Sequence, residues 1–207
     1  MRTTRLVAFS AMILVAAFTP IPAMATSLEV TPFAGYTWGG EFNDSVTGET
    51  LKVDETANYG VMVDFKQDEQ SQIELYFSRQ ATQLKANERL FTGNPLFDLD
   101  IEYFHVGGTY GMDSGKVRPF VVGSLGATHM VPKGPGLDAL TKFSLSLGGG
   151  VKLFATDRVG LRLEGRWFGT LFNGSGSAFC SSGACAISVQ GDLFSQFTTN
   201  AGVFITF

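Results

Sequence analysis

Residues 159–172 constrain the fold most, because the two faces of this segment require opposite surroundings. The sequence VGLRLEGRWFGTLF places Leu163 and Trp167 on one face of an extended strand and Arg162 and Glu164 on the other. A water-soluble barrel would have to bury the charged face or expose the apolar face to water, and both cost free energy. A lipid-facing outside and a polar inside suit both faces.

Seven other segments show the same alternation of apolar and polar residues, which is typical of strands with two different faces. We therefore expect eight strands, at residues 28–40, 57–66, 71–81, 98–111, 117–129, 141–154, 159–172 and 191–207.

The connections between these segments alternate strictly between long and short. The short ones are residues 67–70, 112–116 and 155–158, and the long ones are residues 41–56, 82–97, 130–140 and 173–190. An even number of antiparallel strands with long loops at one end and tight turns at the other is typical of outer-membrane barrels. The sequence predicts an all-β fold, an eight-stranded antiparallel up-and-down transmembrane β-barrel with both termini at the short-turn end.

The first 25 residues are expected to be a cleaved signal peptide rather than part of the fold. Arg2 and Arg5 form a basic start, residues 6–18 are apolar, and Ala23-Met24-Ala25 is a small-x-small cleavage site. Residues 26–207 would then form one outer-membrane barrel domain.

Charge argues against a nucleic-acid partner, and hydropathy argues against a transmembrane helix. The net charge is −4, and it falls to −6 when Arg2 and Arg5 are removed. No cluster of Lys and Arg occurs, so nucleic acid is not an expected partner. After the signal peptide, no apolar run reaches the roughly 18 residues of a transmembrane helix.

The inward-facing positions of the expected strands collect charges of both signs. They are Glu29, Asp64, Glu74, Asp100, Glu102, Glu164, Asp192, Lys66, Arg118, Lys152, Arg162 and Arg166. Eight strands enclose room for side chains or one small ligand, so we expect these charges to pair and fill the lumen. The network proposed on this basis is Glu74, Glu102, Arg118, Lys152, Arg162, Glu164 and Arg166. The alternative is a narrow path for ions or protons. The same pattern directs several aromatic rings inward, which disfavours an open pore: Phe33, Phe104, Phe120, Phe168, Phe194 and Phe204.

The pattern is less regular in residues 98–111. There the alternation predicts that Asp100 and Glu102 face the lumen and that His105 falls on the lipid side. A bulge near Gly107-Gly108, or a position at the membrane interface, would accommodate the histidine. The expected lipid-facing residues are Leu99, Ile101 and Tyr103.

Candidate catalytic and metal sites are few. His105 and His129 are the only histidines, and neither lies in a metal-binding spacing. Barrel enzymes that deacylate lipid A carry a His-x-Ser pair, whereas Val131 and Gly107 stand two residues after these histidines. We therefore expect a protein that is not an enzyme, with no catalytic residue, metal or cofactor.

Cys180 and Cys185 lie in the last long loop, within FCSSGAC. Four residues that include Gly183 separate them, so the chain can fold back and bring the two thiols together. Because exported proteins meet an oxidising compartment, we expect a disulfide.

The expected strands carry a family resemblance. The segments EVTPFAGYTWGG, VRPFVVGSLGATH, FSLSLGGGVKLF, LRLEGRW and the terminal GVFITF resemble the eight-stranded outer-membrane β-barrel families of Gram-negative bacteria, of the OmpA-barrel and OmpX-like kind. The resemblance implies an outer-membrane location and a monomer. It also implies as partners outer-membrane lipid or lipopolysaccharide, the barrel assembly machinery and periplasmic chaperones. The last strand resembles the assembly signal of such barrels, carried here by Phe207, Ile205 and Val203.

Barrels of this kind support several functions, so architecture alone does not select one. The leading hypothesis is a non-enzymatic membrane anchor with a filled polar lumen and four surface loops for adhesion or partner binding. The second is a narrow channel or transporter for small solutes, as in OmpW-like barrels. The third is a lipid-modifying barrel enzyme.

Overall fold

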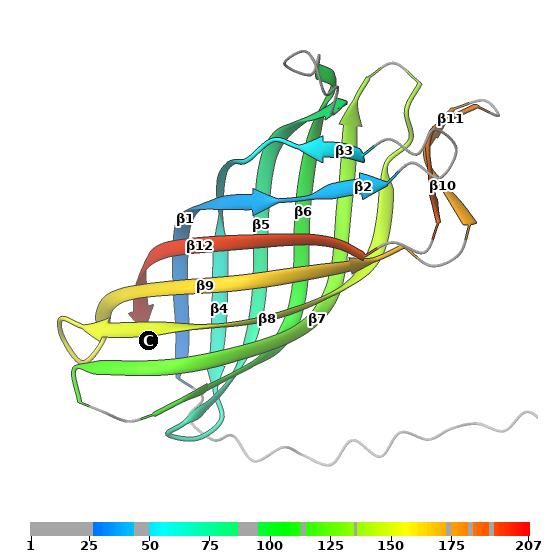
Figure 1. Ribbon diagram of the computed structural model, residues 1–207. Coiled ribbons are helices and arrows are strands. Elements are labelled where there is room, and N and C mark those ends of the chain that lie inside the picture. The colour runs from blue at the N-terminus through cyan, green and yellow to red at the C-terminus, as the bar shows by residue number, and fades with distance from the viewer. Residues whose placement is uncertain are drawn as a thin grey trace, which may run out of the picture.

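A computed structural model describes residues 27–43, 50–86, 95–112, 115–134, 136–172, 175–181, 184–190 and 193–207. All regular structure in these residues is β (Figure 1). The strands are β1 (Leu28–Gly39), β2 (Glu41–Asn43), β3 (Thr50–Val53), β4 (Thr56–Lys66), β5 (Ser71–Ala86), β6 (Pro95–Gly111), β7 (Val117–Lys133), β8 (Leu140–Phe154), β9 (Val159–Leu171), β10 (Ser175–Ser181), β11 (Ala184–Gln190) and β12 (Leu193–Thr206).

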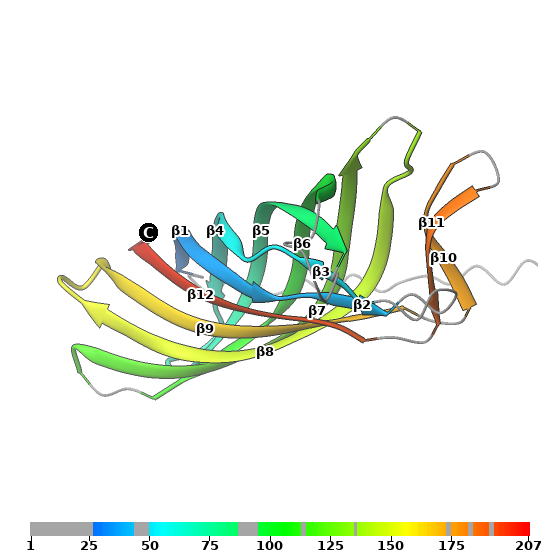
Figure 2. The same cartoon turned by 45° about the horizontal axis from the view of Figure 1, so that its top comes forward.

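Eight of these strands form a closed antiparallel barrel, which confirms the predicted fold. Around the wall the order is β1, β4, β5, β6, β7, β8, β9 and β12. The wall closes because β12 pairs with β1 along the strand, from Glu29 opposite Thr206 to Gly39 opposite Gln196. Figure 2 shows these two strands side by side, although they come from opposite ends of the chain. Closure leaves no open sheet edge around the barrel wall, as a lipid environment requires.

Side chains close the turns at the short-turn end. The Asp68 carboxylate accepts hydrogen bonds from the backbone N–H groups of Gln70 and Ser71, at 2.8 and 2.7 Å. These backbone bonds hold the pKa of Asp68 below its ordinary value. In the turn before β9, the Thr156 hydroxyl accepts from the backbone N–H of Val159 at 3.0 Å. Both are Asx- or ST-type turns, which form because a side chain accepts hydrogen bonds from backbone N–H groups two or three residues later.

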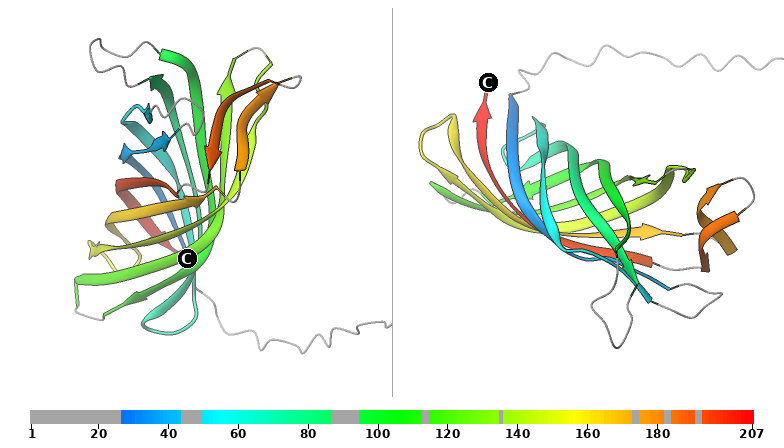
Figure 3. Two further views of the ribbon diagram at one scale, coloured as in Figure 1. Left: turned by 45° about the vertical axis from the view of Figure 1, so that its right-hand side comes forward. Right: turned by 90° about the horizontal axis from the view of Figure 1, so that it is seen from above.

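At the long-loop end, one side of the barrel is extended into a raised wall, which we call the rim. It consists of β2, β3, residues 79–86 of β5, residues 95–102 of β6 and residues 129–133 of β7. β3 pairs with both β2 and β5, so the two short strands continue the sheet beyond the end of β4. The rim is visible in both views of Figure 3. Much of it lies in segments that the sequence pattern assigns to loops.

A separate hairpin of β10 and β11 stands at the same end of the barrel (Figure 3). Its register places Cys180 directly opposite Cys185. The side chains of both cysteines lie outside the described part of the chain, so the disulfide stays a prediction. Residues 1–25, the expected signal peptide, also lie outside the described residues.

Below the rim, the outside of the barrel carries large exposed apolar side chains, which we call the apolar belt. Every strand of the barrel contributes to it, through residues such as Tyr36, Tyr59, Leu75, Val106, Leu125, Leu147, Leu163 and Val203. A continuous apolar outside with a polar inside is the arrangement of a barrel embedded in lipid.

β6 corrects the sequence analysis, because its two faces are reversed relative to the prediction. Leu99, Ile101 and Tyr103 face inward and are buried, whereas Phe104 faces outward. His105 also faces inward and is buried. The expected bulge near Gly107-Gly108 is not needed, because pairing with β5 and β7 is continuous through these residues and the only β5–β6 register shift lies at Leu84/Lys85.

Among the described residues, no helix is long and apolar enough to cross a membrane.

Candidate functional site

The middle of the lumen holds a buried group of two cations and three carboxylates, which we call the charged cluster. Its members are Asp64 on β4, Glu74 on β5, and Arg162, Glu164 and Arg166 on β9. Each lies on the inward face of its strand, because alternate residues of a strand point to the same side. The barrel thereby brings together residues that are up to 102 positions apart in sequence.

Every member of the charged cluster is bonded to a partner of opposite sign. Glu164 accepts from Arg162 Nη2 and Arg166 Nε at 2.6 Å each. Glu74 also bridges both arginines, at 2.6 Å to Arg162 Nη2 and 2.7 Å to Arg166 Nη2. Asp64 adds a third acid to Arg162 at 2.9 Å. Buried charges persist only when they are paired and hydrogen-bonded in this way.

Aromatic rings cover the charged cluster on two sides. The Arg162 guanidinium lies 4.6 Å from the centroid of Phe120, and the Arg166 guanidinium lies 4.3 Å from that of Tyr76. Arginine stacks on aromatic faces because its cation is attracted to the ring quadrupole. The rings therefore stabilise the cations and fill the remaining cross-section.

Toward the short-turn end, Lys152 forms a second and separate ion pair. Its Nζ donates to Glu29 at 2.6 Å and to Gln72 at 2.7 Å. A cavity of about 60 Å³ lies beside this pair, and Arg118 also lines it. Arg118 donates to the Gly115 carbonyl and stacks on Phe154 at 4.4 Å, at the mouth of the barrel.

Toward the long-loop end, His105 is held between two serines. Its Nδ1 lies 3.0 Å from Ser124 Oγ, and its Nε2 lies 2.8 Å from Ser144 Oγ. Ser124 Oγ is in turn 2.6 Å from Ser146 Oγ. Among the described residues, no carboxylate is bonded to the ring. The histidine therefore links β6, β7 and β8 across the inside of the wall.

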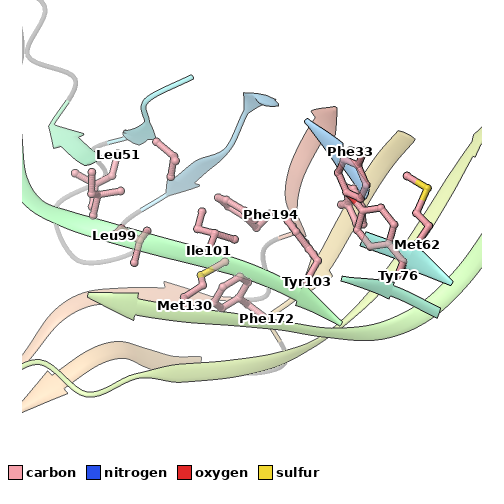
Figure 4. Packing of buried hydrophobic residues seen from close by; sticks show 13 residues of the cluster. Phe33, Leu51, Met62, Tyr76, Leu99, Ile101, Tyr103, Met130, Phe172 and Phe194 are labelled. Atoms are coloured by element: carbon pink, nitrogen blue, oxygen red, sulfur yellow. The ribbon is translucent and has the colours of Figure 1, made fainter. Parts of the chain in front are cut away.

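The lumen is closed at the level of the rim by buried apolar side chains, which we call the apolar plug (Figure 4). They come from six parts of the chain that lie far apart in sequence. Leu99 and Ile101 of β6 have no exposed surface, and neither have Leu84, Met130 and Phe194. The plug comprises Leu51, Val53, Leu84, Leu99, Ile101, Met130, Phe172 and Phe194.

The structure does not bring together the whole predicted network. Glu74, Arg162, Glu164 and Arg166 form the charged cluster, whereas Lys152 and Arg118 lie nearer the short-turn end. Glu102 does not face the lumen, which is a correction. It lies on the outer face of β6, with Oε1 3.7 Å from Arg79 Nε.

Asp100 and Lys66 also depart from the predicted lumen set. Asp100 lies on the outer face and pairs with Lys133 of β7 at 2.8 Å. Lys66 ends its strand and is exposed. Asp192 lies outside the described residues. The inward prediction for Phe104 is wrong for the same reason as that for Glu102, since both share the outer face of β6.

The last strand lies where the predicted assembly signal requires it. Val203, Ile205 and Phe207 point outward, and 70% of Phe207 is exposed. The backbone N–H of Phe207 donates to the Leu28 carbonyl at 2.8 Å. The chain end is thus part of the closing seam, and its role in assembly remains a prediction.

Sequence reasoning missed Asp64 as a member of the proposed network, and it missed most of the plug, of which only Phe194 was expected to face inward. Asp64 was expected to face inward but was not included in the network. Leu51, Val53, Leu84 and Met130 lie in segments expected to be loops, and Leu99 and Ile101 lie on the face of β6 expected to meet lipid; Phe172 and Phe194 lie in expected strands. A usable signal exists, because charges and apolar residues exchange faces within β6 at residues 102–104.

The described residues contain no group of three or more His, Cys, Asp or Glu side chains able to hold a metal ion. The only cations of the charged cluster are two arginines, and carboxylates bind both of them. This geometry stabilises a filled lumen.

The fold and lumen together define a class: the chain has the fold of eight-stranded outer-membrane β-barrels. Comparison with protein families finds no match, and no curated protein matches the sequence. Solved structures do match. The outer membrane protein OprG from Pseudomonas aeruginosa is 11% identical with a TM-score of 0.62, covering 88% of this chain and 96% of that one.

Two further solved structures support the same fold. Neisserial surface protein A is 15% identical with a TM-score of 0.57, over 87% of this chain and 97% of that one. The outer membrane protein AlkL, solved in lipid bilayers, is 14% identical with a TM-score of 0.55, over 87% and 90%. The predicted outer-membrane location is consistent with these similarities and with the apolar belt.

Proposed function

We propose that this protein is a non-enzymatic outer-membrane anchor with a closed lumen, and that its rim and long loops bind a partner outside the cell. One observation carries the proposal: side chains fill the lumen at two separate levels. The apolar plug fills the lumen at the level of the rim, and the charged cluster fills it at the level of the apolar belt. A barrel of eight strands has little interior beyond such side chains.

The environment of His105 supports the non-enzymatic part of the proposal. Both ring nitrogens are engaged by serine hydroxyls, and only 4% of the residue is exposed. A general base must reach the proton that it removes from a substrate. Between the plug and the charged cluster, His105 has no such access.

The closed lumen is tested by conductance in planar lipid bilayers. We expect no stable openings from the wild-type protein, with a porin inserted under the same conditions as the positive control. Stable openings that disappear in Arg162→Ala would overturn the anchor proposal. They would favour the second candidate, a narrow ion path.

One observation favours that second candidate. The Asp64 Oδ1 and Arg166 Nη1 atoms are buried without a hydrogen-bond partner among the described residues. Buried polar atoms of this kind commonly bind water, and the cavity beside Lys152 opens the lumen toward the short-turn end. A path along these groups would still have to pass the apolar plug.

Partner binding by the outer end is tested in cells that display the protein. Replacing residues 173–192 by a two-residue Asn-Gly turn removes the β10–β11 hairpin, and we expect it to reduce adhesion to host-cell surfaces. The matched control replaces the turn at residues 155–158, at the opposite end of the barrel. Equal adhesion of cells with and without the protein would contradict the partner-binding part.

The non-enzymatic part is tested on the lipid A of the same cells, whose mass should not change when the protein is produced. A change in lipid A mass that is abolished by replacing His105 or His129 would contradict this part.

A further inference from the structure

The outer face of β4, β5, β6 and β7 carries an apolar groove of about 430 Å³. Its outward-facing lining is Val61, Val63, Leu75, Phe77, Phe104, Val106 and Leu125. Phe77 and Phe104 close its upper end, with ring centroids 4.8 Å apart. The volume lies within the usual range of ligand sites, and the lining suits hydrocarbon.

Charged side chains follow in the next rows of the same sheet. The register places Phe77 opposite Phe104, and one step further, Arg79 opposite Glu102. Consecutive outward residues of a strand are roughly 7 Å apart. The charged group of Arg79, Asp100, Glu102 and Lys133 therefore begins directly above the groove, at the level where the apolar belt ends.

Within this charged group, the cations are more exposed than the two acids; beside it, Asp98 is also exposed and lies opposite Lys133 on the outer face of β6. The side chains of Arg79 and Lys133 are 40% and 50% exposed, whereas those of Asp100 and Glu102 are 5% and 20% exposed. The acids lie beneath and hold the two bases in place. A guanidinium has five N–H donors and an ammonium three, so both bases retain the capacity to bind a phosphate oxygen while paired with Asp100.

We propose that the groove and the charged group above it form a binding site for lipopolysaccharide, with an acyl chain in the groove and a headgroup phosphate on Arg79 and Lys133. Two independent features carry this assignment, the apolar groove below and the two exposed cations above, and they match the two chemistries of an acylated phosphate-bearing lipid. The long-loop end faces the outer leaflet in a barrel of this class. The site does not depend on whether the lumen conducts.

The barrel offers a matched control groove. On β1, β9 and β12 the outer face has a second groove of about 410 Å³, lined in part by Leu161, Leu163, Ala201 and Val203. Above this groove, toward the long-loop end, the outer face of β1 carries the aromatic residues Tyr36 and Trp38 instead of a group of ion pairs. This groove provides hydrocarbon contact without a site for phosphate.

The test uses purified full-length barrel in detergent with purified lipopolysaccharide as the probe, and counts retained lipid per barrel by native mass spectrometry. A charge-assisted hydrogen bond is worth about a factor of ten in binding, so we expect Arg79→Ala with Lys133→Ala to weaken retention about tenfold or more. Val106→Trp, which fills the groove, should act in the same direction. Lys52→Ala, which removes an exposed base of the rim, and Leu163→Trp, in the control groove, should retain lipid as the wild type does.

Folding of each variant is checked by the heat-dependent shift in gel mobility. If the double alanine variant does not fold, Arg79→Gln with Lys133→Gln replaces it. Wild-type retention by the folded double variant would overturn the proposal, as would equal losses in the two control variants. Equal retention of phosphatidylglycerol, with the same dependence on Arg79 and Lys133, would overturn the assignment to lipopolysaccharide. None of these outcomes bears on bilayer conductance, which tests the proposed function separately.

Discussion

The rim and the belt-level part of the barrel share strands β5, β6 and β7 but have opposite polarity. At the belt, β6 directs Val106 and Phe104 outward and His105 inward; in the rim, it directs Glu102 outward and Ile101 inward. Neither the strand nor its register is interrupted between the two. The solvent outside the wall changes from lipid to water, so the rim has the apolar inside of a soluble protein.

β7 reverses at the same level as β6. Its outward Leu125 belongs to the apolar belt, whereas its outward Lys133 belongs to the charged group. Ser124 faces the lumen below, and Met130 enters the plug above. A polarity reversal at one level on neighbouring strands locates the edge of the membrane. Alternation in a sequence therefore predicts that a strand has two faces without saying which of them lies inside the barrel.

The largest effect should follow from breaking the charged cluster. Arg162→Leu leaves Asp64, Glu74 and Glu164 with one fewer buried cation, and removal of one partner of a buried ion pair costs about 3–5 kcal/mol. Urea unfolding in lipid vesicles measures the loss of unfolding free energy. Arg79→Leu is the control, because its partners lie on the outside, and a loss equal to that of Arg162→Leu would contradict the distinction.

A slightly smaller effect is expected in the plug. Ile101→Ala should cost about 2–5 kcal/mol, since it opens a cavity among fully buried side chains. We expect faster hydrogen exchange at rim amides, with belt amides of β8 and β9 unchanged. The earlier expectation, a lipid-facing Ile101, predicts no such local effect, so unchanged exchange in the rim would restore it.

The membrane edge is tested by one charge placed at two levels of β7. Leu125→Arg, in the belt, should destabilise the barrel by about 2–4 kcal/mol, the cost of a cation facing lipid near the midplane. Val131→Arg, three outward positions further on, should change stability by less than about 1 kcal/mol because that position faces water. Comparable unfolding curves for the two variants would place the membrane edge elsewhere.

The smallest effect is expected for Glu102→Ala. A partly exposed ion pair with a 3.7 Å separation from Arg79 contributes at most about 1 kcal/mol. A residue within the lumen network would cost several times more. A loss as large as that of Arg162→Leu would therefore reinstate the lumen position that the sequence pattern suggests.

Local pattern predicted most of the barrel. Strand starts and short turns follow from residues that alternate in polarity and from side chains such as Asp68 and Thr156 that close turns on their own backbone. The rim could not be predicted equally well, because β2 and β3 gain their stability from pairing with distant β5 and with each other. The same holds for the plug, which collects one or two residues from each of six parts of the chain.

The sequence by itself determined that this chain forms strands with one charged and one apolar face, and that eight of them close into a barrel embedded in lipid. This follows because period-two alternation and turn chemistry are local properties. Only the tertiary structure decided which charges meet. Arg162 and Arg166 share Glu74 because the barrel places β5 and β9 across the lumen from each other, and Glu102 is excluded because the solvent outside β6 changes one row above Phe104.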